Sequence, residues 1–357
     1  MNKVFFIIAG GTGGHIIPAL SVYYAIKKEK NCDAYFICRK KDLQIVEQLK
    51  SIKDNILFLP GRGLRRKLVL SNLISLIYVL YGIIISFFWN LKLKPAAILS
   101  FGGYLGFPVL TTGVIMRIPL FLFEQNSYPG VVNRIFKNRA KIVFINFKYT
   151  RKFFKNSFVV GNPLRETLKQ KLPAHKCYKF FNFKKKDVIL VMGGSQGALK
   201  INQVFSKIVE KLKNFNIIWI TGKSHFNKFK SKQLKGRIYI TPYLKEMEYA
   251  YNITKLAIAR AGALTITELA YFSIPAIFVP LPHSAENHQL INAKIVEKAG
   301  GGIVIEEKNL NPEILFQNIN QIFKNKKLLK RMSNSIRKVY IPDSTEKIMR
   351  KIQQVIR

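Results

Sequence analysis

Two glycine-rich segments stand where phosphate-binding loops are expected. The first, Gly10–His15 (GGTGGH), follows the apolar run Val4–Ala9, and the second, Gly193–Ala198 (GGSQGA), follows Val188–Met192. A glycine-rich turn between a strand and a helix exposes backbone N–H groups beside the positive end of the helix, so a diphosphate can approach without meeting a Cβ atom. A single such loop is a weak signal, and two loops at equivalent places are a stronger one. The pair predicts a donor and an acceptor that both carry diphosphates, bound in a cleft at the carboxyl ends of the strands.

His15 closes the first loop at the expected start of a helix. A neutral imidazole can accept a proton from a sugar hydroxyl, because its unperturbed pKa is about 6.5. The same residue could simply cap the helix or pack the loop. The pairing of the two loops favours a catalytic base.

The acidic residues argue against a metal-dependent reaction. The five aspartates are isolated and no Asp-x-Asp occurs, whereas a metal-dependent sugar transferase needs paired carboxylates to hold its cation on the diphosphate. Helix N-termini and a basic side chain, Arg165 or Arg260, would then neutralise the leaving group. We therefore expect no metal and no cofactor.

Two later segments carry polar groups suited to a nucleotide sugar. The stretch Arg260–Glu268 (RAGALTITE) follows an apolar run and begins a helix that Thr265 or Thr267 can cap. A carboxylate such as Glu268, one turn into a helix, can hold both ribose hydroxyls while the helix end faces phosphate. The segment His283–Gln289 (HSAENHQ) has no zinc-site spacing and is expected to be a polar loop that contacts the sugar.

Twelve short apolar runs are expected to be strands, because they do not alternate and so suit burial on both faces. They are Val4–Ala9, Ala34–Cys38, Ile56–Leu59, Ala96–Ser100, Leu120–Glu124, Ile142–Ile145, Val188–Met192, Ile217–Thr221, Ile238–Thr241, Leu256–Ala259, Ala276–Val279 and Gly302–Ile305. Helical patterns lie between most of them, including a helix opened by Pro18 and the helix Leu199–Leu212. The alternation predicts an α/β, doubly wound fold with parallel sheets.

The chain is expected to form two Rossmann-like domains, 1–160 and 161–357. The length of 357 residues favours two domains, and the two strand–glycine-loop–helix units are about 180 residues apart. The join lies near Val160–Pro163, where Gly and Pro interrupt the pattern. The last helix, roughly Ser344–Ile356, could pack on either domain.

Composition excludes several classes of protein. At 48% hydrophobic residues the chain is too apolar for intrinsic disorder, and three cysteines without a C-x-x-C motif favour reduced thiols in the cytosol. The net charge of +40 divides into +18 before residue 160 and +22 after it, unlike a nucleic-acid arm that concentrates charge. The apolar run Val4–Ala9 is too short for a signal peptide. The excess positive charge suits anionic ligands or an anionic membrane surface.

The 24 residues between Lys67 and Lys92 carry no charge. This length permits a membrane span, but a crossing would separate strands of one sheet on the two sides of the bilayer. A buried crossover helix and a helix partly dipped into the membrane interface are the other interpretations. Tyr78, Tyr81 and Trp89, together with the basic flanks, favour the interfacial helix.

Seven motifs occur in an order that resembles the MurG family, the bacterial N-acetylglucosaminyltransferases of peptidoglycan synthesis. They are GGTGGH, Phe101–Tyr104 (FGGY), Glu124–Asn126 (EQN), Gly161–Arg165 (GNPLR), GGSQGA, RAGALTITE and Glu286–Gln289 (ENHQ). The resemblance implies a GT-B fold and transfer of GlcNAc from UDP-GlcNAc to the MurNAc 4-hydroxyl of lipid I, with inversion, to give lipid II. It also implies a peripheral protein on the cytoplasmic face of the bacterial cell membrane.

The resemblance also implies site residues. His15 matches the candidate base, and the backbone of Leu244 would meet the uracil. The implied donor contacts are Thr12, Gly13, Gly14, Asn126, Arg165, Ser195, Leu244, Ala263, Leu264, Thr265, Ile266, Thr267, Glu268 and Gln289.

Two other functions remain open at this point. A UDP-GlcNAc epimerase of similar fold would need no acceptor, and the apolar helix and the Phe101–Tyr104 segment argue against it. A nucleic-acid-binding protein would explain the charge, but the sequence has no helix-turn-helix, zinc-finger or RNP pattern. We therefore expect no nucleic acid among the partners.

Overall fold

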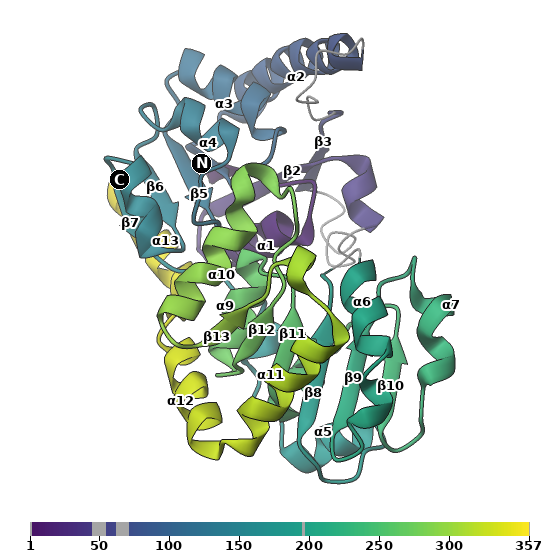
Figure 1. Cartoon of the computed structure of the whole chain (residues 1–357). Helices are drawn as coiled ribbons and strands as arrows, with labels where there is room; N and C mark the ends of the chain where they lie inside the picture. The colour runs from purple at the N-terminus through teal and green to yellow at the C-terminus, as the bar shows by residue number, and fades with distance from the viewer. Residues whose placement is uncertain (1, 45–54, 62–70, 195–196, 357) are drawn as a thin grey trace. The chain divides into compact units, whose positions relative to one another are not determined.

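The computed structural model of the chain, drawn in Figure 1, describes residues 2–44, 55–61, 71–194 and 197–356. Backbone contacts divide the chain into two units, Met1–Arg165 with Ile341–Arg357, and Glu166–Tyr340. The last helix, α13 (Ser344–Val355), thus belongs to the first unit, where it packs on α1 (Gly13–Lys28). The first unit extends five residues beyond the join predicted at residue 160.

The first unit is a seven-stranded parallel sheet in the order β3-β2-β1-β4-β5-β6-β7. Its strands are β1 (Lys3–Ile8), β2 (Cys32–Cys38), β3 (Ile56–Phe58), β4 (Ala97–Ser100), β5 (Leu120–Glu124), β6 (Ile142–Ile145) and β7 (Ser157–Val159). One face packs on α1 and α13 through a core that includes Ile16, Tyr23 and Ile352. The other face packs on α2 (Ser71–Leu93), α3 (Gly106–Ile115) and α4 (Val131–Phe136). Helices on both faces confirm the doubly wound prediction.

The second unit is a six-stranded parallel sheet in the order β10-β9-β8-β11-β12-β13. Its strands are β8 (Val188–Met192), β9 (Asn216–Ile220), β10 (Ile238–Thr241), β11 (Thr254–Ala259), β12 (Ala276–Phe278) and β13 (Gly302–Val304). Its helices are α5 (Ala174–Phe180), α6 (Leu199–Ser206), α7 (Phe226–Phe229), α8 (Met247–Ile253), α9 (Ala263–Tyr271), α10 (His288–Lys298), α11 (Pro312–Lys324) and α12 (Lys326–Arg337). Two parallel α/β units of this kind match the GT-B expectation.

Three details differ from the predictions. α1 begins at Gly13 and carries Pro18 inside it, so Pro18 does not open the helix. The helix predicted over 199–212 ends at Ser206 and is followed by a short 3₁₀ turn, Val209–Lys211. β7 was not predicted, because its three residues lie at the sheet edge and none is fully buried.

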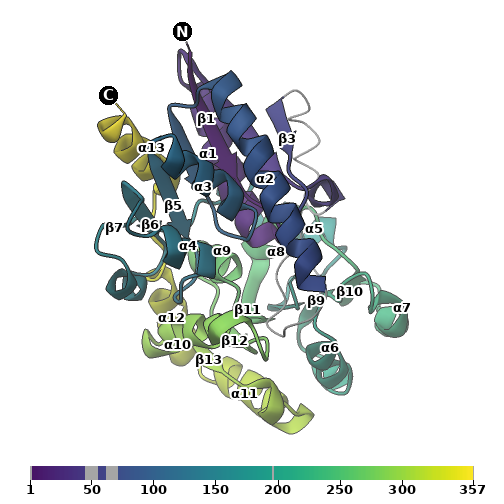
Figure 2. The same ribbon diagram turned by 90° about the horizontal axis from the view of Figure 1, so that it is seen from above.

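α2 lies alongside α3, as Figure 2 shows, and presents two different faces. On the inner face Asn90, 1% exposed, donates from Nδ2 to Thr112 Oγ1 at 2.9 Å, and Trp89 packs against the core. The outer face is apolar and exposed. It carries Ile74, Leu76, Ile77, Tyr78, Leu80, Tyr81, Ile84, Phe87, Phe88 and Leu91. The interpretation as a fully buried crossover helix is therefore wrong. Trp89, which was expected at the membrane interface, lies on the inner face of α2 and packs against the core.

Candidate functional site

The glycine loop of the first unit lies where the strand order of its sheet reverses. β1 and β4 are neighbours, and their following connections run in opposite directions, which is the usual ligand position in an open parallel sheet. The β1 loop supplies Thr12 as the N-cap of α1, with Gly13 and Gly14 in the first turn. The β4 connection supplies Gly102 and Gly103, both with positive φ. The predicted loop residues therefore lie at the carboxyl edge of this sheet, where ligands of open parallel sheets usually bind.

The imidazole of His15 is held between these two connections. Its Nδ1 lies 3.2 Å from the carbonyl oxygen of Gly10, and a carbonyl can only accept, so Nδ1 carries the proton. The lone pair is then on Nε2, which lies 3.5 Å from where a Cβ on Gly102 would stand. A half-buried imidazole in this tautomer can act as a general base at the β4 side of the loop.

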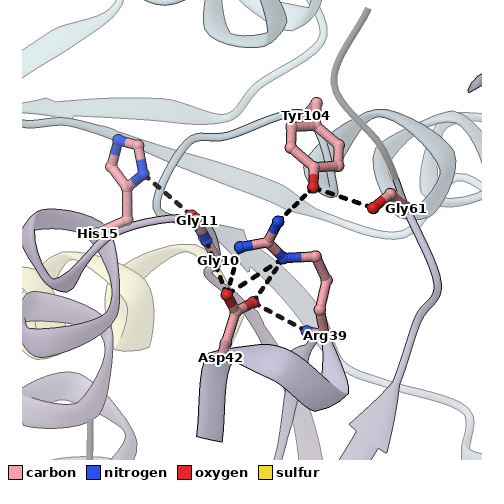
Figure 3. Close-up of polar contacts among 7 residues, drawn as sticks. All are labelled: Gly10, Gly11, His15, Arg39, Asp42, Gly61 and Tyr104. Atoms are coloured by element: carbon pink, nitrogen blue, oxygen red, sulfur yellow. Dashed lines mark hydrogen bonds and ion pairs between the residues drawn. The ribbon is translucent and has the colours of Figure 1, made fainter. Parts of the chain in front are cut away.

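A buried ion pair holds the first glycine loop from below, as Figure 3 shows. Asp42, fully buried, accepts the backbone N–H of Gly11 at 3.2 Å and pairs with the guanidinium of Arg39. Arg39 Nη1 donates to the hydroxyl of Tyr104 at 2.6 Å, and that hydroxyl donates to the Gly61 carbonyl at 3.0 Å. A Cβ on Gly10 would lie 2.6 Å from Leu105 Cδ1 and 2.8 Å from Asp42 Oδ2, so a larger residue there would displace both side chains. The network fixes the loop relative to the β2 and β4 connections.

Removal of the Asp42 carboxylate should destabilise the first unit. Asp42→Ala leaves the buried Arg39 charge unpaired, and we expect a loss of about 3–5 kcal/mol in the free energy of unfolding. Chemical denaturation followed by circular dichroism measures this loss. The double variant Arg39→Ala/Asp42→Ala removes both charges and should lose less than Asp42→Ala alone. An equal or larger loss in the double variant would contradict the ion-pair account.

A second buried carboxylate organises the loop that carries Asn126. Glu124, 2% exposed, accepts the backbone N–H groups of Asn126 at 3.0 Å and Gly130 at 2.9 Å, and the Asn133 amide at 2.9 Å. Burial raises the pKa of the Glu124 carboxyl, and the hydrogen bonds from Gly130 and Asn126 act in the opposite direction. Glu124 thus positions Asn126, a predicted donor contact, without facing solvent itself.

Glu124→Gln should destabilise the first unit by about 1–3 kcal/mol, because the new NH₂ group must face one of the N–H donors of the loop. The free energy of unfolding from urea titration measures the effect. Glu29→Gln is the matched control: Glu29 is exposed, and its substitution should change stability by less than about 0.5 kcal/mol. Equal stability of the Glu124 and Glu29 variants would show that the acceptor-only carboxylate is not required.

The second unit repeats the arrangement at β8 and β11, again adjacent strands where the order reverses. A Cβ on Gly193 would lie 2.1 Å from the Ala198 backbone nitrogen, and one on Gly197 would lie 2.2 Å from the Thr221 carbonyl. Both positions therefore require glycine, and the loop leads directly into α6. Ser195, a predicted donor contact, lies outside the described residues.

α9 follows β11 after a short loop and carries six of the fourteen predicted donor residues. Its N-cap is Gly262, and Thr267 Oγ1 donates back to the Ala263 carbonyl at 2.9 Å, so the prediction that Thr265 or Thr267 caps the helix is wrong. Ala263 is buried, whereas Leu264 and Thr265 in the first turn are partly exposed.

Ile266 differs from these neighbours. Its side chain is fully buried and its N–H donates to the Gly262 carbonyl at 2.9 Å, so Ile266 helps to hold the first turn of α9 in shape, and its contact with the donor stays a prediction.

Glu268 occupies the second turn of α9 and is 5% exposed. Its Oε2 accepts the hydroxyl of Tyr251 from α8 at 2.8 Å. Tyr251 stacks on Phe272, with ring centroids 5.2 Å apart. Tyr251, which the sequence analysis did not identify, therefore holds the Glu268 carboxylate in one orientation.

Other predicted residues have clear structural partners. Arg260 pairs with Glu307 and donates to the Val279 and Pro280 carbonyls at 3.1 and 3.0 Å. Its charge is neutralised, which leaves Arg165 as the basic candidate for the leaving group. Arg165 ends the main segment of the first unit.

The last two predicted contacts follow β10 and β12. Leu244 is buried after β10, with its backbone in a polar turn in which Thr241 Oγ1 donates to the Tyr243 carbonyl at 2.7 Å. Gln289 lies in the first turn of α10, and its Oε1 accepts the Leu281 N–H at 3.0 Å. Gln289 is thus helical, whereas a loop position was expected.

Arg39, Asp42 and Tyr251 are the site residues that the sequence analysis missed. Arg39 and Asp42 directly follow an expected strand, at the edge where the other site residues lie, and that position was an available signal. No sequence signal joins Tyr251 to Glu268, because the two residues are 17 positions apart on different helices.

Two family models and several known proteins match the chain. Residues 5–145 match the glycosyltransferase family 28 N-terminal domain, and residues 188–348 match the family 28 C-terminal domain. The chain is 38% identical to the UDP-N-acetylglucosamine--N-acetylmuramyl-(pentapeptide) pyrophosphoryl-undecaprenol N-acetylglucosamine transferase of Aquifex aeolicus strain VF5, over 96% of this chain and 97% of that protein.

Two solved structures are similar over nearly the whole chain. The crystal structure of Acinetobacter baumannii MurG has a TM-score of 0.77 and 26% identity, and covers 99% of this chain and 100% of that one. UDP-GlcNAc 2-epimerase from Neisseria meningitidis has a TM-score of 0.72 at 13% identity, with 99% and 100% coverage, and this likeness shows the fold alone. The motifs, the two parallel units and these relatives agree, and the chain belongs to the MurG family of glycosyltransferases.

Proposed function

We propose that the protein transfers GlcNAc from UDP-GlcNAc to the MurNAc 4-hydroxyl of lipid I, an undecaprenyl-diphosphate-linked acceptor, to form lipid II. Its relatives carry the name of this transferase, and the chain covers nearly their full length. The reaction is a single in-line displacement with inversion at the anomeric carbon. The acceptor hydroxyl attacks, its proton moves to the base, and UDP departs.

The observation that supports the mechanism is the hydrogen bond from His15 Nδ1 to the Gly10 carbonyl. It directs the lone pair of Nε2 away from the loop, where it can take the acceptor proton as the oxygen attacks. We assign the leaving diphosphate to the Gly193–Ala198 loop, the first turn of α9 and Arg165, and the ribose to Glu268. Leu244, Asn126 and Gln289 are assigned as further donor contacts.

Lipid I consumption tests the proposal directly. The protein is incubated with radiolabelled UDP-GlcNAc and a short-chain lipid I analogue in EDTA, and the products are separated. Disaccharide-linked lipid formed in the chelator supports both the transfer and its independence from divalent cations. Conversion of UDP-GlcNAc to its epimer without lipid would instead favour the epimerase, and loss of transfer on chelation would contradict the metal-free mechanism.

We further propose that the outer face of α2 docks the protein on the cytoplasmic membrane surface, where the acceptor is anchored. By length and composition Ile74–Leu93 could also cross a membrane. However, β3 and β4, which flank α2 in the sequence, belong to one sheet, and the Asn90–Thr112 bond ties the helix to α3. An exposed apolar face on a helix anchored in this way suits the interface. Each Lys or Arg that lies close to the membrane surface would add about 1 kcal/mol to the free energy of binding to anionic lipid.

Replacement of two exposed side chains of α2 should weaken membrane binding by at least tenfold. Ile84 and Phe88 are 57% and 63% exposed and lie one turn apart, and Ile84→Ser/Phe88→Ser removes about 2 kcal/mol of apolar burial on docking. Co-sedimentation with vesicles containing phosphatidylglycerol measures the change. Leu199→Ser/Leu234→Ser, on the second unit, is the matched control and should bind like the wild type. Equal loss in both variants would contradict a docking role for α2.

A further inference from the structure

A cavity of about 880 Å³ opens at the edge of the second sheet that the proposed donor residues do not use. Asp187 directly precedes β8, Thr254 and Lys255 open β11, and Ser273 lies just before β12, so the cavity is at the amino ends of these strands. The glycine loop and the start of α9 follow the carboxyl ends of the same strands. Because all strands of the sheet are parallel, the cavity and the donor residues lie at opposite edges.

The cavity is strongly basic. Five of its fifteen lining residues are Lys or Arg, about twice their share of the whole chain, so the overall basicity of the protein does not account for the cluster. The five are Lys171, Lys255, Lys326, Lys330 and Arg337. Within the described residues none of them forms an ion pair, and Asp187 is the single carboxylate on the lining. The five basic side chains are exposed to solvent around an open cavity, and a concave surface with this excess of cations attracts anions.

Four of the five hydroxyl groups on the lining donate to other protein groups, among them that of Tyr271, which donates to the Lys169 carbonyl at 3.4 Å. Tyr251 donates to Glu268 at 2.8 Å, Thr254 donates to the Ala250 carbonyl at 2.7 Å, and Ser333 donates to the Ser273 carbonyl at 2.6 Å. A ligand in the cavity would therefore meet ammonium and guanidinium groups as its principal donors. Such donors bind carboxylate or phosphate more strongly than neutral polar groups.

Arg337 is held in place for such a role. Its Nη1 donates to the Tyr271 carbonyl, and its guanidinium carbon lies 5.6 Å from the Tyr271 ring centroid and 5.2 Å from that of Tyr340. A guanidinium fixed in this way loses little side-chain entropy when it binds an oxyanion, and its planar fork suits phosphate. The aromatic rings of Tyr271 and Phe272 add flat apolar walls to the same cavity.

We propose that this cavity is a second ligand site, which binds the phosphate group of a small phosphorylated molecule of nucleotide or sugar-phosphate size. The volume lies within the range of about 300–1,000 Å³ usual for small-molecule sites. Four lysines provide point charges for phosphate and Arg337 provides a planar donor pair. The proposal does not depend on the transfer reaction, and the two sites share one residue, because Tyr251 lines the cavity and donates to Glu268.

Titration calorimetry with inorganic pyrophosphate at low ionic strength tests the site. The wild type should bind, and Lys326→Gln/Lys330→Gln should bind at least tenfold more weakly, because both lysines line the cavity from α12. The matched control is Lys324→Gln/Lys327→Gln, which removes the same charge from exposed neighbours outside the lining and should bind within about twofold of the wild type. Circular dichroism confirms that both variants fold, and the transfer assay on the same variants separates this site from the proposed function.

A second experiment distinguishes whether the ligand of the cavity is a soluble phosphate or a lipid headgroup. The same variants are sedimented with vesicles of phosphatidylglycerol and of phosphatidylcholine. Selective loss of pyrophosphate binding in the lining variant supports a soluble phosphorylated ligand. Selective loss of binding to phosphatidylglycerol vesicles alone places a lipid phosphate in the cavity. Equal behaviour of the lining and control variants with both probes would overturn the proposal.

Discussion

Replacing His15 with alanine should lower kcat for GlcNAc transfer by about 10²–10⁴-fold, the usual contribution of a positioned general base. The KM for UDP-GlcNAc should stay within about twofold, because the imidazole acts on the acceptor proton and the donor contacts lie on other residues. The Nδ1 bond to Gly10 fixes the tautomer, so the loss should appear in the chemical step. Single-turnover kinetics at saturating UDP-GlcNAc measures that step separately from product release.

His175→Ala is the matched control for this experiment. His175 is an exposed histidine on α5, in the second unit, and its loss should leave kcat and KM unchanged. Near-normal turnover of the His15 variant, with UDP-GlcNAc bound equally well, would make the base assignment wrong. A rise in the KM for UDP-GlcNAc at unchanged kcat would instead move His15 to the donor site.

The fold could be predicted because its strands are buried on both faces. β5 and β8, for example, are fully buried along their whole length; β8 is an uninterrupted apolar run, and β5 is apolar up to its last residue, Glu124. β7 lacks this signal, since Phe158 is exposed and the strand has a neighbour on one side only. The start of α1 was misplaced for a local reason. Pro18 suggested a first turn, whereas the helix begins at Gly13 and tolerates the missing N–H inside it.

The positions of the site residues follow from one rule, the gathering of loops at the carboxyl ends of parallel strands. That rule, applied to the sequence, identified the glycine loops and the α9 segment, whereas Asn126 came from the family resemblance alone. The rule could not identify the side chains that hold these site residues in position. The Tyr251–Glu268 bond depends on side-chain directions set by tertiary packing, and spacing in the sequence carries no information about it. The Arg39–Asp42 pair is local, three residues apart, but the sequence does not show that its carboxylate also accepts the Gly11 N–H. Arg260 is the opposite case: its motif suggested a phosphate contact, but its side chain pairs with Glu307. The sequence did not indicate this pair, because the two residues are 47 positions apart.

Glu268→Ala should raise the KM for UDP-GlcNAc by about 10–100-fold and change kcat at saturating donor by less than about threefold. Hydrogen bonds from ribose hydroxyls to a carboxylate contribute about 1.5–3 kcal/mol, and they persist in both the bound substrate and the transition state. The substitution therefore removes binding energy that the two states share. Initial rates over a range of UDP-GlcNAc concentrations give both constants, and thermal unfolding verifies that the variant is folded.

Tyr251→Phe separates the carboxylate itself from its orientation. It keeps the ring that stacks on Phe272 and removes the hydroxyl that donates to Glu268 Oε2. With the carboxylate present but less fixed, the KM for UDP-GlcNAc should rise by less than about fivefold, well below the effect of Glu268→Ala. If Glu268→Ala lowered kcat and left KM unchanged, the ribose assignment would be wrong, because a donor contact made in the ground state must appear in KM. If the two variants raised KM equally, the hydroxyl and the carboxylate would act as one unit, with Tyr251 as the residue that makes Glu268 competent to bind.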